Sequence, residues 1–130
     1  ALSIPFPTED PGLFLTYAIA NMGVDVKDLE AAVDTEIELV KKELISEREF
    51  QKLRNQMESQ FVQQNSTVAG RAENLANYHV YYGDANLINN EIDRYMKVTK
   101  EDIQRVANKY LTKNNRVVLH YLPKSAQPSN

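Results

Sequence analysis

The sequence predicts a mixed fold of strands and helices, in which a long helical stretch lies between two strands. Residues 12–20 form a short apolar run bounded by Pro-Gly and by Asn-Met-Gly, which is typical of a buried strand. Between residues 26 and 110, apolar side chains recur at the spacings of three and four that mark amphipathic helices. Residues 116–122 are rich in β-branched and aromatic side chains, which favours a second strand.

Composition limits the function classes. The chain has 130 residues, of which 42% are hydrophobic and 25% charged, as expected for one soluble globular domain. The net charge of -3 indicates no charged partner, and no basic stripe suggests nucleic acid. Without cysteine, disulfides and thiolate metal sites are excluded. No apolar run reaches the roughly 18 residues of a membrane span. No signal peptide is visible, and the opening Ala1 without Met suggests a processed or truncated chain.

The N-terminal region combines a loop with the first strand. Residues 1–11 hold three of the five prolines, so we expect a turn-rich loop there. Residues 2–6 read as the stump of a strand. The run 12–20 that follows is expected to be a strand buried on both faces, with a short helix as the alternative.

Two long helices should come next. Asp25 is placed as an N-cap before a helix over residues 26–44, whose apolar stripe occupies one face. Ser46 and Glu49 have the spacing of a capping box, in which each side chain bonds the backbone amide of the other residue. They predict the start of a second helix. Its buried face is marked by Phe50, Leu53, Met57 and Phe61.

The rest of the chain reads as shorter elements. The polar patch 63–67 should kink or break the second helix, and helical spacing then resumes toward a stop at Gly83. A shorter helix is predicted over residues 87–96. Thr99, with Asp102 three residues on, should cap another helix. Residues 113–115 read as a turn, Pro123 as the end of the strand 116–122, and residues 124–130 as a tail.

No catalytic or metal-binding residue stands out in this chain, and the substrate-binding residues are unknown. Zincins hold their metal with two histidines four residues apart on one helix, whereas His79 and His120 lie on different predicted elements. A two-histidine site completed by a distant carboxylate is the alternative. The carboxylate pairs read as solvated faces, and no serine-nucleophile or phosphate-loop motif occurs. The tyrosines around residues 78–82 favour helix packing, with an aromatic binding surface as the alternative.

The order of several short motifs adds a resemblance. Gly12-Leu13-Phe14 comes first, Val98-Thr99 followed by Glu101-Asp102-Ile103 opens a later helix, and Arg116-Val117-Val118-Leu119 closes the series. This succession resembles the second half of a domain in the insulinase/pitrilysin-like zinc metallopeptidases, which include the mitochondrial processing peptidases. The resemblance runs over about residues 11–123. It implies an α+β fold with helices packed on one face of an antiparallel sheet, to which residues 13–20 and 117–122 contribute. Residues 12–123 would be the C-terminal half of a processing-peptidase-like domain.

The resemblance also implies a role. In that family a His-x-x-Glu-His helix of an earlier domain and a later Glu hold zinc, and no residue of this chain can be assigned to them. We therefore expect a non-catalytic C-terminal segment of a zinc-dependent metallo-endopeptidase, inactive alone and without a cofactor of its own. It would form part of the wall of the peptide-binding chamber and dock to the zinc-bearing domain.

The expected partners follow from this role. They are the zinc-bearing domain, on the same or a separate chain, and an unfolded peptide substrate; nucleic acid and a membrane span are not expected. Homo- or heterodimers remain open, and a bacterial parent would be periplasmic or secreted. The alternative function is an inactive peptidase homologue that serves as a binding or assembly subunit. A helical interaction domain is a third alternative, against which the predicted strand 116–122 argues.

Overall fold

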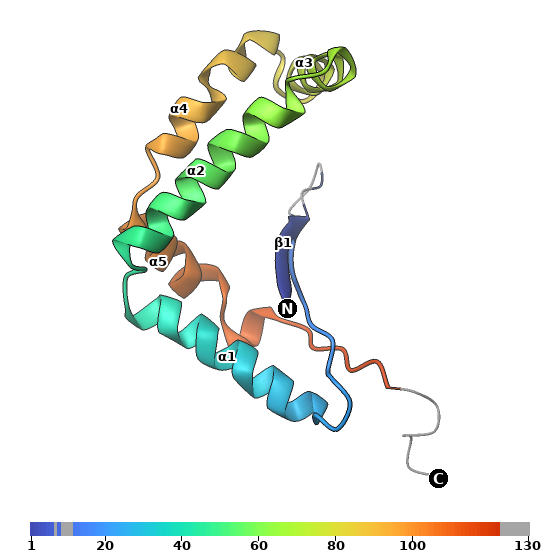
Figure 1. Cartoon of the computed structure of the whole chain (residues 1–130), viewed down its shortest axis with the longest axis vertical. Helices are drawn as coiled ribbons and strands as arrows, with labels where there is room; N and C mark the ends of the chain where they lie inside the picture. Colours follow the sequence, from blue (N-terminus) through green and yellow to red (C-terminus); the bar gives the residue numbers. More distant parts are fainter. Residues whose placement is uncertain (7, 9–11, 123–130) are drawn as a thin grey trace.

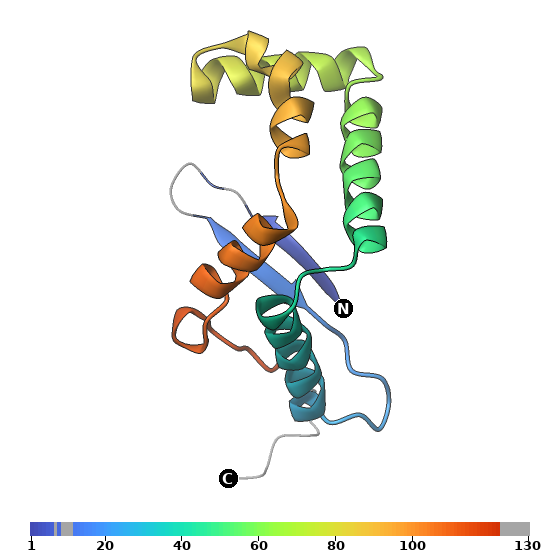
Figure 2. The ribbon, with the colours of Figure 1, turned by 90° about the vertical axis from the view of Figure 1, so that its left-hand side faces the viewer.

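The computed structural model describes residues 1–6, 8 and 12–122. The helices form an arch, and a β-hairpin lies on its open side (Figures 1 and 2). In chain order the elements are β1 (Leu2–Phe6), β2 (Leu13–Tyr17), α1 (Val26–Lys42), α2 (Glu47–Gln64), α3 (Val68–Tyr82), the 3-10 helix η1 (Ala85–Asn90), α4 (Glu91–Met96), α5 (Lys100–Tyr110) and the 3-10 turn η2 (Lys113–Asn115). The protein is thus mostly helical with a small antiparallel sheet, broadly of the α+β class.

The two N-terminal strands pair antiparallel, with Leu2 opposite Tyr17 and Phe6 opposite Leu13. The predictions of strands over residues 2–6 and in the run 12–20 are confirmed. The expected burial of the second strand is wrong, because both Leu13 and Phe14 are exposed although they point to opposite faces. The remainder of the predicted N-terminal loop, residues 7 and 9–11, lies outside the described residues.

The predicted helix starts are confirmed. The Asp25 carboxylate accepts from the Lys27 amide at 2.8 Å, which caps α1. Both predicted capping boxes form, at Ser46 before α2 and at Thr99 before α5. These caps satisfy amides that the first turn of a helix leaves without a partner. Local sequence therefore fixes where these three helices begin.

The break between α2 and α3 is a sharp corner made by polar side chains. Asn65 Nδ2 donates to the Phe61 carbonyl at 2.9 Å, and Ser66 Oγ donates to the Gln63 carbonyl at 2.7 Å. These bonds occupy carbonyls that the end of α2 would otherwise expose. Gly70 lies so close to the end of α2 that a Cβ on it would be 2.0 Å from the Gln64 carbonyl oxygen. The predicted interruption at residues 63–67 is confirmed.

The helix predicted over residues 87–96 has two parts. Gly83 ends α3 with φ +76°, as predicted. The Asp84 carboxylate then accepts from the Asn86 amide at 2.9 Å and starts a 3-10 helix. Three asparagines fall within residues 86–90, and their side chains compete with helical backbone bonds. The α-helix proper therefore begins only at Glu91.

Helix pairs supply what little core the described residues have. α1 packs on α5, α2 on α4, and α3 on η1. Asn108 Nδ2 donates to the Lys41 carbonyl at 3.0 Å, and Lys100 pairs with Glu47 at 3.0 Å. Among the described residues, only Phe50 and Ala107 are buried. A single domain of this size normally buries far more.

The prediction of a strand over residues 116–122 is wrong for this chain by itself. The segment runs extended, with φ -141° and ψ 155° at Arg116, but it belongs to no ladder in the described part of the chain. A strand needs a hydrogen-bonded neighbour, and β2 takes β1 instead. The described sheet is therefore the β1–β2 hairpin, and helices packed on one face of a larger sheet are not observed. Pro123 and the predicted tail 124–130 lie outside the described residues.

Candidate functional site

The C-terminal extended segment, residues 116–122, presents alternating faces. Val117, Leu119 and Tyr121 are 84%, 88% and 99% exposed, whereas the even-numbered Val118 and Leu122 are 45% and 39% exposed. A period of two is the signature of strand geometry. The backbone is therefore arranged as a strand, with one apolar side turned to solvent.

The other side of the segment is held on α1 by ion pairs. The Arg116 guanidinium bonds Asp34 through both terminal nitrogens, and one of them also donates to Glu30 at 3.1 Å. His120 Nε2 lies 3.1 Å from the second Glu30 oxygen. The hydrogen bond from Arg116 is the main cause that lowers the pKa of Asp34. Because both anchors are even-numbered residues, the odd-numbered apolar side chains face outward.

The outward side of this segment is an apolar docking surface, which we define as Val117, Leu119 and Tyr121, all of them exposed. The hairpin also leaves Leu13 and Phe14 exposed, on its two opposite faces. Exposed apolar patches of this kind mark interaction sites more often than free surface. The strand edges add unpaired backbone groups that another strand can satisfy.

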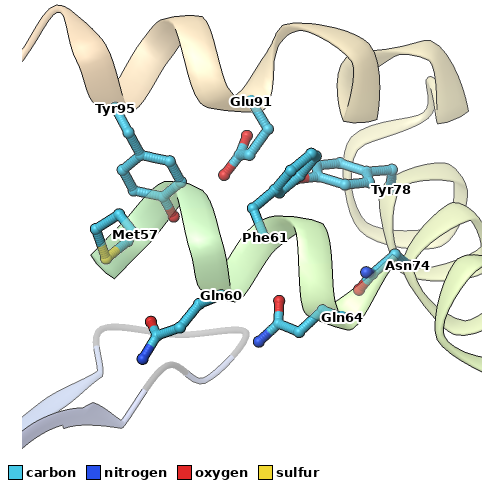
Figure 3. Close-up of a pocket in the computed structure, with 8 residues that line it drawn as sticks. All are labelled: Met57, Gln60, Phe61, Gln64, Asn74, Tyr78, Glu91 and Tyr95. Carbon is cyan, nitrogen blue, oxygen red and sulfur yellow. The ribbon is translucent and has the colours of Figure 1, made fainter. Parts of the chain in front are cut away.

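A second feature is a pocket of about 220 Å³ between α2, α3 and α4 (Figure 3). Helix α2 contributes one wall, α3 a second and α4 a third. The lining residues are Met57, Gln60, Phe61, Gln64, Asn74, Tyr78, Glu91 and Tyr95. The pocket is therefore a mixture of ring faces, amides and one carboxylate.

Electrostatics in the pocket centre on Glu91. Burial, followed by a hydrogen bond to Glu91, raises the pKa of Tyr78 to about 12. Burial and then the charge of Glu91 also raise the pKa of Tyr95. Both phenols therefore stay neutral at physiological pH and can donate to the carboxylate.

The two histidines are not brought together. His79 lies on α3 and His120 lies beside α1, at opposite ends of the arch (Figure 1). The alternative of a two-histidine metal site thus has no support in this geometry. Across residues 1–6, 8 and 12–122, no group of three or more His, Asp or Glu side chains could hold a metal ion. No helix in the same ranges is long and apolar enough to cross a membrane.

The tyrosine cluster divides between two environments. Tyr78 packs in the pocket, with its ring 6.0 Å from that of Tyr82. Tyr81 and Tyr82 themselves are mostly exposed. The expectation of helix packing is therefore confirmed for Tyr78, whereas the other two rings lie on the surface.

The sequence analysis did not identify the carboxylates that hold the extended segment, Glu30 and Asp34, or the carboxylate of the pocket, Glu91. Glu30 and Asp34 are four residues apart, a spacing that places them on one face of α1. That spacing was a usable signal. Nothing in the sequence indicated that Arg116 and His120 would meet them. Glu91 gave no signal, because its importance comes from two tyrosines on different helices.

No known family model matches the chain, and no curated protein matches it.

Proposed function

We propose that this chain is a non-catalytic C-terminal segment of a zinc-dependent metallo-endopeptidase, which docks to the zinc-bearing domain and forms part of the peptide chamber wall. One observation carries the proposal: among the described residues only Phe50 and Ala107 are buried, while the docking surface is open. A chain that leaves its apolar side chains in water is stabilised when another body covers them. The resemblance in its motifs supplies the class of that body.

Docking through the apolar surface would be favourable because it takes exposed apolar side chains out of water. Fully burying one large apolar side chain contributes about 1.5–3 kcal/mol. Leu119 and Tyr121 are almost completely exposed in the chain alone, so nearly all of this contribution remains available. Their burial would occur in the assembled parent.

The geometry of the extended segment suggests how the parts join. In the assembled domain, residues 13–20 and 117–122 would belong to one antiparallel sheet with helices on one face. Strands of the zinc-bearing half would supply the missing ladder bonds. The ion pair of Arg116 with Asp34 and the hydrogen bond between His120 and Glu30 hold the segment against α1, which supports this arrangement.

Catalysis would take place on the partner. A zinc ion there would polarise the scissile carbonyl and activate water. The role of this chain would be steric: its helical arch would enclose an unfolded peptide and exclude bulk solvent. The partner would be on the same or a separate chain, and dimers of either kind are compatible with this role.

A second candidate function is an inactive peptidase homologue that acts as a binding or assembly subunit. The same docking surface favours it, because an exposed apolar surface calls for a partner that covers it, whether or not that partner is catalytically active. The upstream sequence of the parent distinguishes the two. A His-x-x-Glu-His motif in an earlier domain supports the peptidase, and its lack supports the assembly subunit.

The decisive experiment uses this chain and the upstream part of its parent. We expect the purified chain alone to retain no zinc after dialysis and to cleave no unstructured peptide, and the mixture with the upstream part to form a complex. The double variant Leu119→Glu and Tyr121→Glu should abolish that complex, because it places two charges in the interface.

Glu101→Gln on α5 serves as the surface control and should leave the complex intact. The proposal is wrong if the chain alone binds stoichiometric zinc and turns over peptide. It is equally wrong if the double variant binds the upstream part as tightly as the unchanged chain does.

A further inference from the structure

The pocket between α2, α3 and α4 is rich in acceptors and contains no basic side chain. Among the described residues that line it, the one carboxylate is Glu91, whose side chain is 16% exposed. Three amides, from Gln60, Gln64 and Asn74, line the opposite wall, as Figure 3 shows. Three rings, from Phe61, Tyr78 and Tyr95, and the Met57 side chain make up the remainder. A lining of this kind suits a ligand that donates hydrogen bonds.

The contacts that Glu91 makes within the chain leave it able to accept more. Glu91 contributes to the raised pKa values of Tyr78 and Tyr95, and all three side chains line the pocket. Arg94 is its ion-pair partner at 3.5 Å, but that side chain is 66% exposed, and a long pair in solvent contributes little. A carboxylate offers about four lone-pair sites. The carboxylate of Glu91 therefore keeps acceptor capacity for a donor that enters the pocket.

One of the three amides is held in place by a hydrogen bond. Asn74 Nδ2 donates to Asn65 Oδ1 at 3.1 Å, which fixes that amide at the α2–α3 corner. An amide that uses its nitrogen in this way keeps a carbonyl oxygen that can accept from a donor.

We propose that this pocket binds a side-chain cation, the ammonium of a lysine or the guanidinium of an arginine, presented by another protein segment. Pockets for small-molecule ligands span about 300–1,000 Å³, so a volume of about 220 Å³ suits a single side chain. Ring faces attract a cation, and the carboxylate adds a charge-assisted hydrogen bond. This site goes beyond the proposed function, since it concerns a ligand of the helical arch and not the docking surface.

The same chain already uses this kind of contact elsewhere. Arg54 lies over the Phe50 ring at 5.6 Å, and Lys109 lies over the Tyr110 ring at 4.9 Å. Within the described residues, no cation is recorded over the three rings of the pocket. A cation from outside the chain would make the equivalent contact there and would also meet Glu91.

The test is an NMR titration of the full chain with three small probes. These are the Nα-acetyl amides of arginine, lysine and citrulline, the last being a neutral isostere of arginine. Both cations should shift the Met57 methyl and the Tyr95 ring signals. Citrulline should bind about tenfold more weakly, because it lacks the charge-assisted bond. Either order of the two cations supports the proposal.

The variant Glu91→Gln removes the charge but keeps an oxygen that can accept from both tyrosines. It should lose the preference for arginine over citrulline, while the control Glu101→Gln keeps it. Far-UV circular dichroism checks that the variant is folded; if it is not, the arginine–citrulline comparison in the unchanged chain decides. Equal affinity for those two probes would overturn the proposal, as would an unaltered preference in folded Glu91→Gln.

Discussion

Arg116 donates to the carboxylate of Asp34, 82 residues earlier in the chain, with one terminal nitrogen bonded to each oxygen. A fork of this kind fixes the direction of both side chains as well as their distance. It is the contact that turns the extended segment toward α1 and leaves Val117, Leu119 and Tyr121 outside. The orientation of the docking surface therefore depends largely on this guanidinium, with the His120 contact to Glu30 as the second anchor.

Replacing this guanidinium should release the segment. In Arg116→Gln the fork is lost and only the His120 contact with Glu30 remains. Backbone amides of residues 116–121 should then show markedly lower heteronuclear NOE values, with helix content unchanged. Arg105→Gln is the matched control, since its pair with Asp102 is local to α5. Unchanged NOE values in Arg116→Gln would show that the fork does not hold the segment.

Acid should release the same segment. The folded pKa of Asp34 is lowered from its usual value of 3.8, mainly by the Arg116 hydrogen bond. A lowered folded pKa means that the ionised form contributes stability above the unfolded value. That contribution is lost as the pH falls through the folded pKa, below about 4.

The measurement is the same set of NOE values followed through an acid titration. We expect the order of residues 116–121 to drop in that acidic window. In Asp34→Asn the ionisable group is gone, so this step should disappear. A step of equal size in the variant would assign the transition to another carboxylate.

Gly70→Ala should destabilise the chain, which is the opposite of the usual effect. Within a helix, exchanging glycine for alanine ordinarily stabilises by about 0.4–1 kcal/mol. Here the new Cβ would meet the backbone oxygen of Gln64 at 2.0 Å, so the corner between α2 and α3 must open. Overpacking of this kind costs about 1–3 kcal/mol.

Urea unfolding followed by circular dichroism measures this change. A gain in stability would mean that the corner is looser than described. Gly83→Asn is a useful comparison, because a left-handed cap with nothing within 4 Å of its Cβ position should tolerate asparagine.

Alkali should reveal the environment of Tyr78. Its folded pKa is raised to about 12, whereas the ordinary value is 10.0. A raised value means that the neutral form contributes stability below pH 10, and that this contribution is lost as the pH rises from 10 to 12. Tyrosinate absorbance should therefore show a late-titrating component. The component should shrink by one tyrosine in Tyr78→Phe, because the pKa of Tyr95 is raised as well, and an unchanged amplitude would assign it to other tyrosines.

Local signals were enough to predict much of the helical part. The caps at Asp25, Ser46 and Thr99 and the stop at Gly83 each depend on side chains within a few residues. Such contacts depend on residues close together in the sequence and need no tertiary neighbour. The break at residues 63–67 was predictable for the same reason.

Pairing over long distances was not predictable. Residues 116–122 have the composition of a strand, but a ladder also needs a neighbour, and composition says nothing about which one is present. The partnership of Arg116 with Asp34 depends on how α1 and α5 pack. The pocket depends on three helices meeting around Glu91, an arrangement that no periodicity in one helix encodes.

The packing of α1 on α5 has a consequence for how the chain folds. The contacts among α2, α3, η1 and α4 join elements close together in sequence, whereas α1 and α5 must close a long loop around them. Short-range contacts form quickly, and loop closure is the slow step. The helices α2, α3 and α4 should therefore assemble first, and the packing of α1 on α5 should be the rate-limiting step of folding.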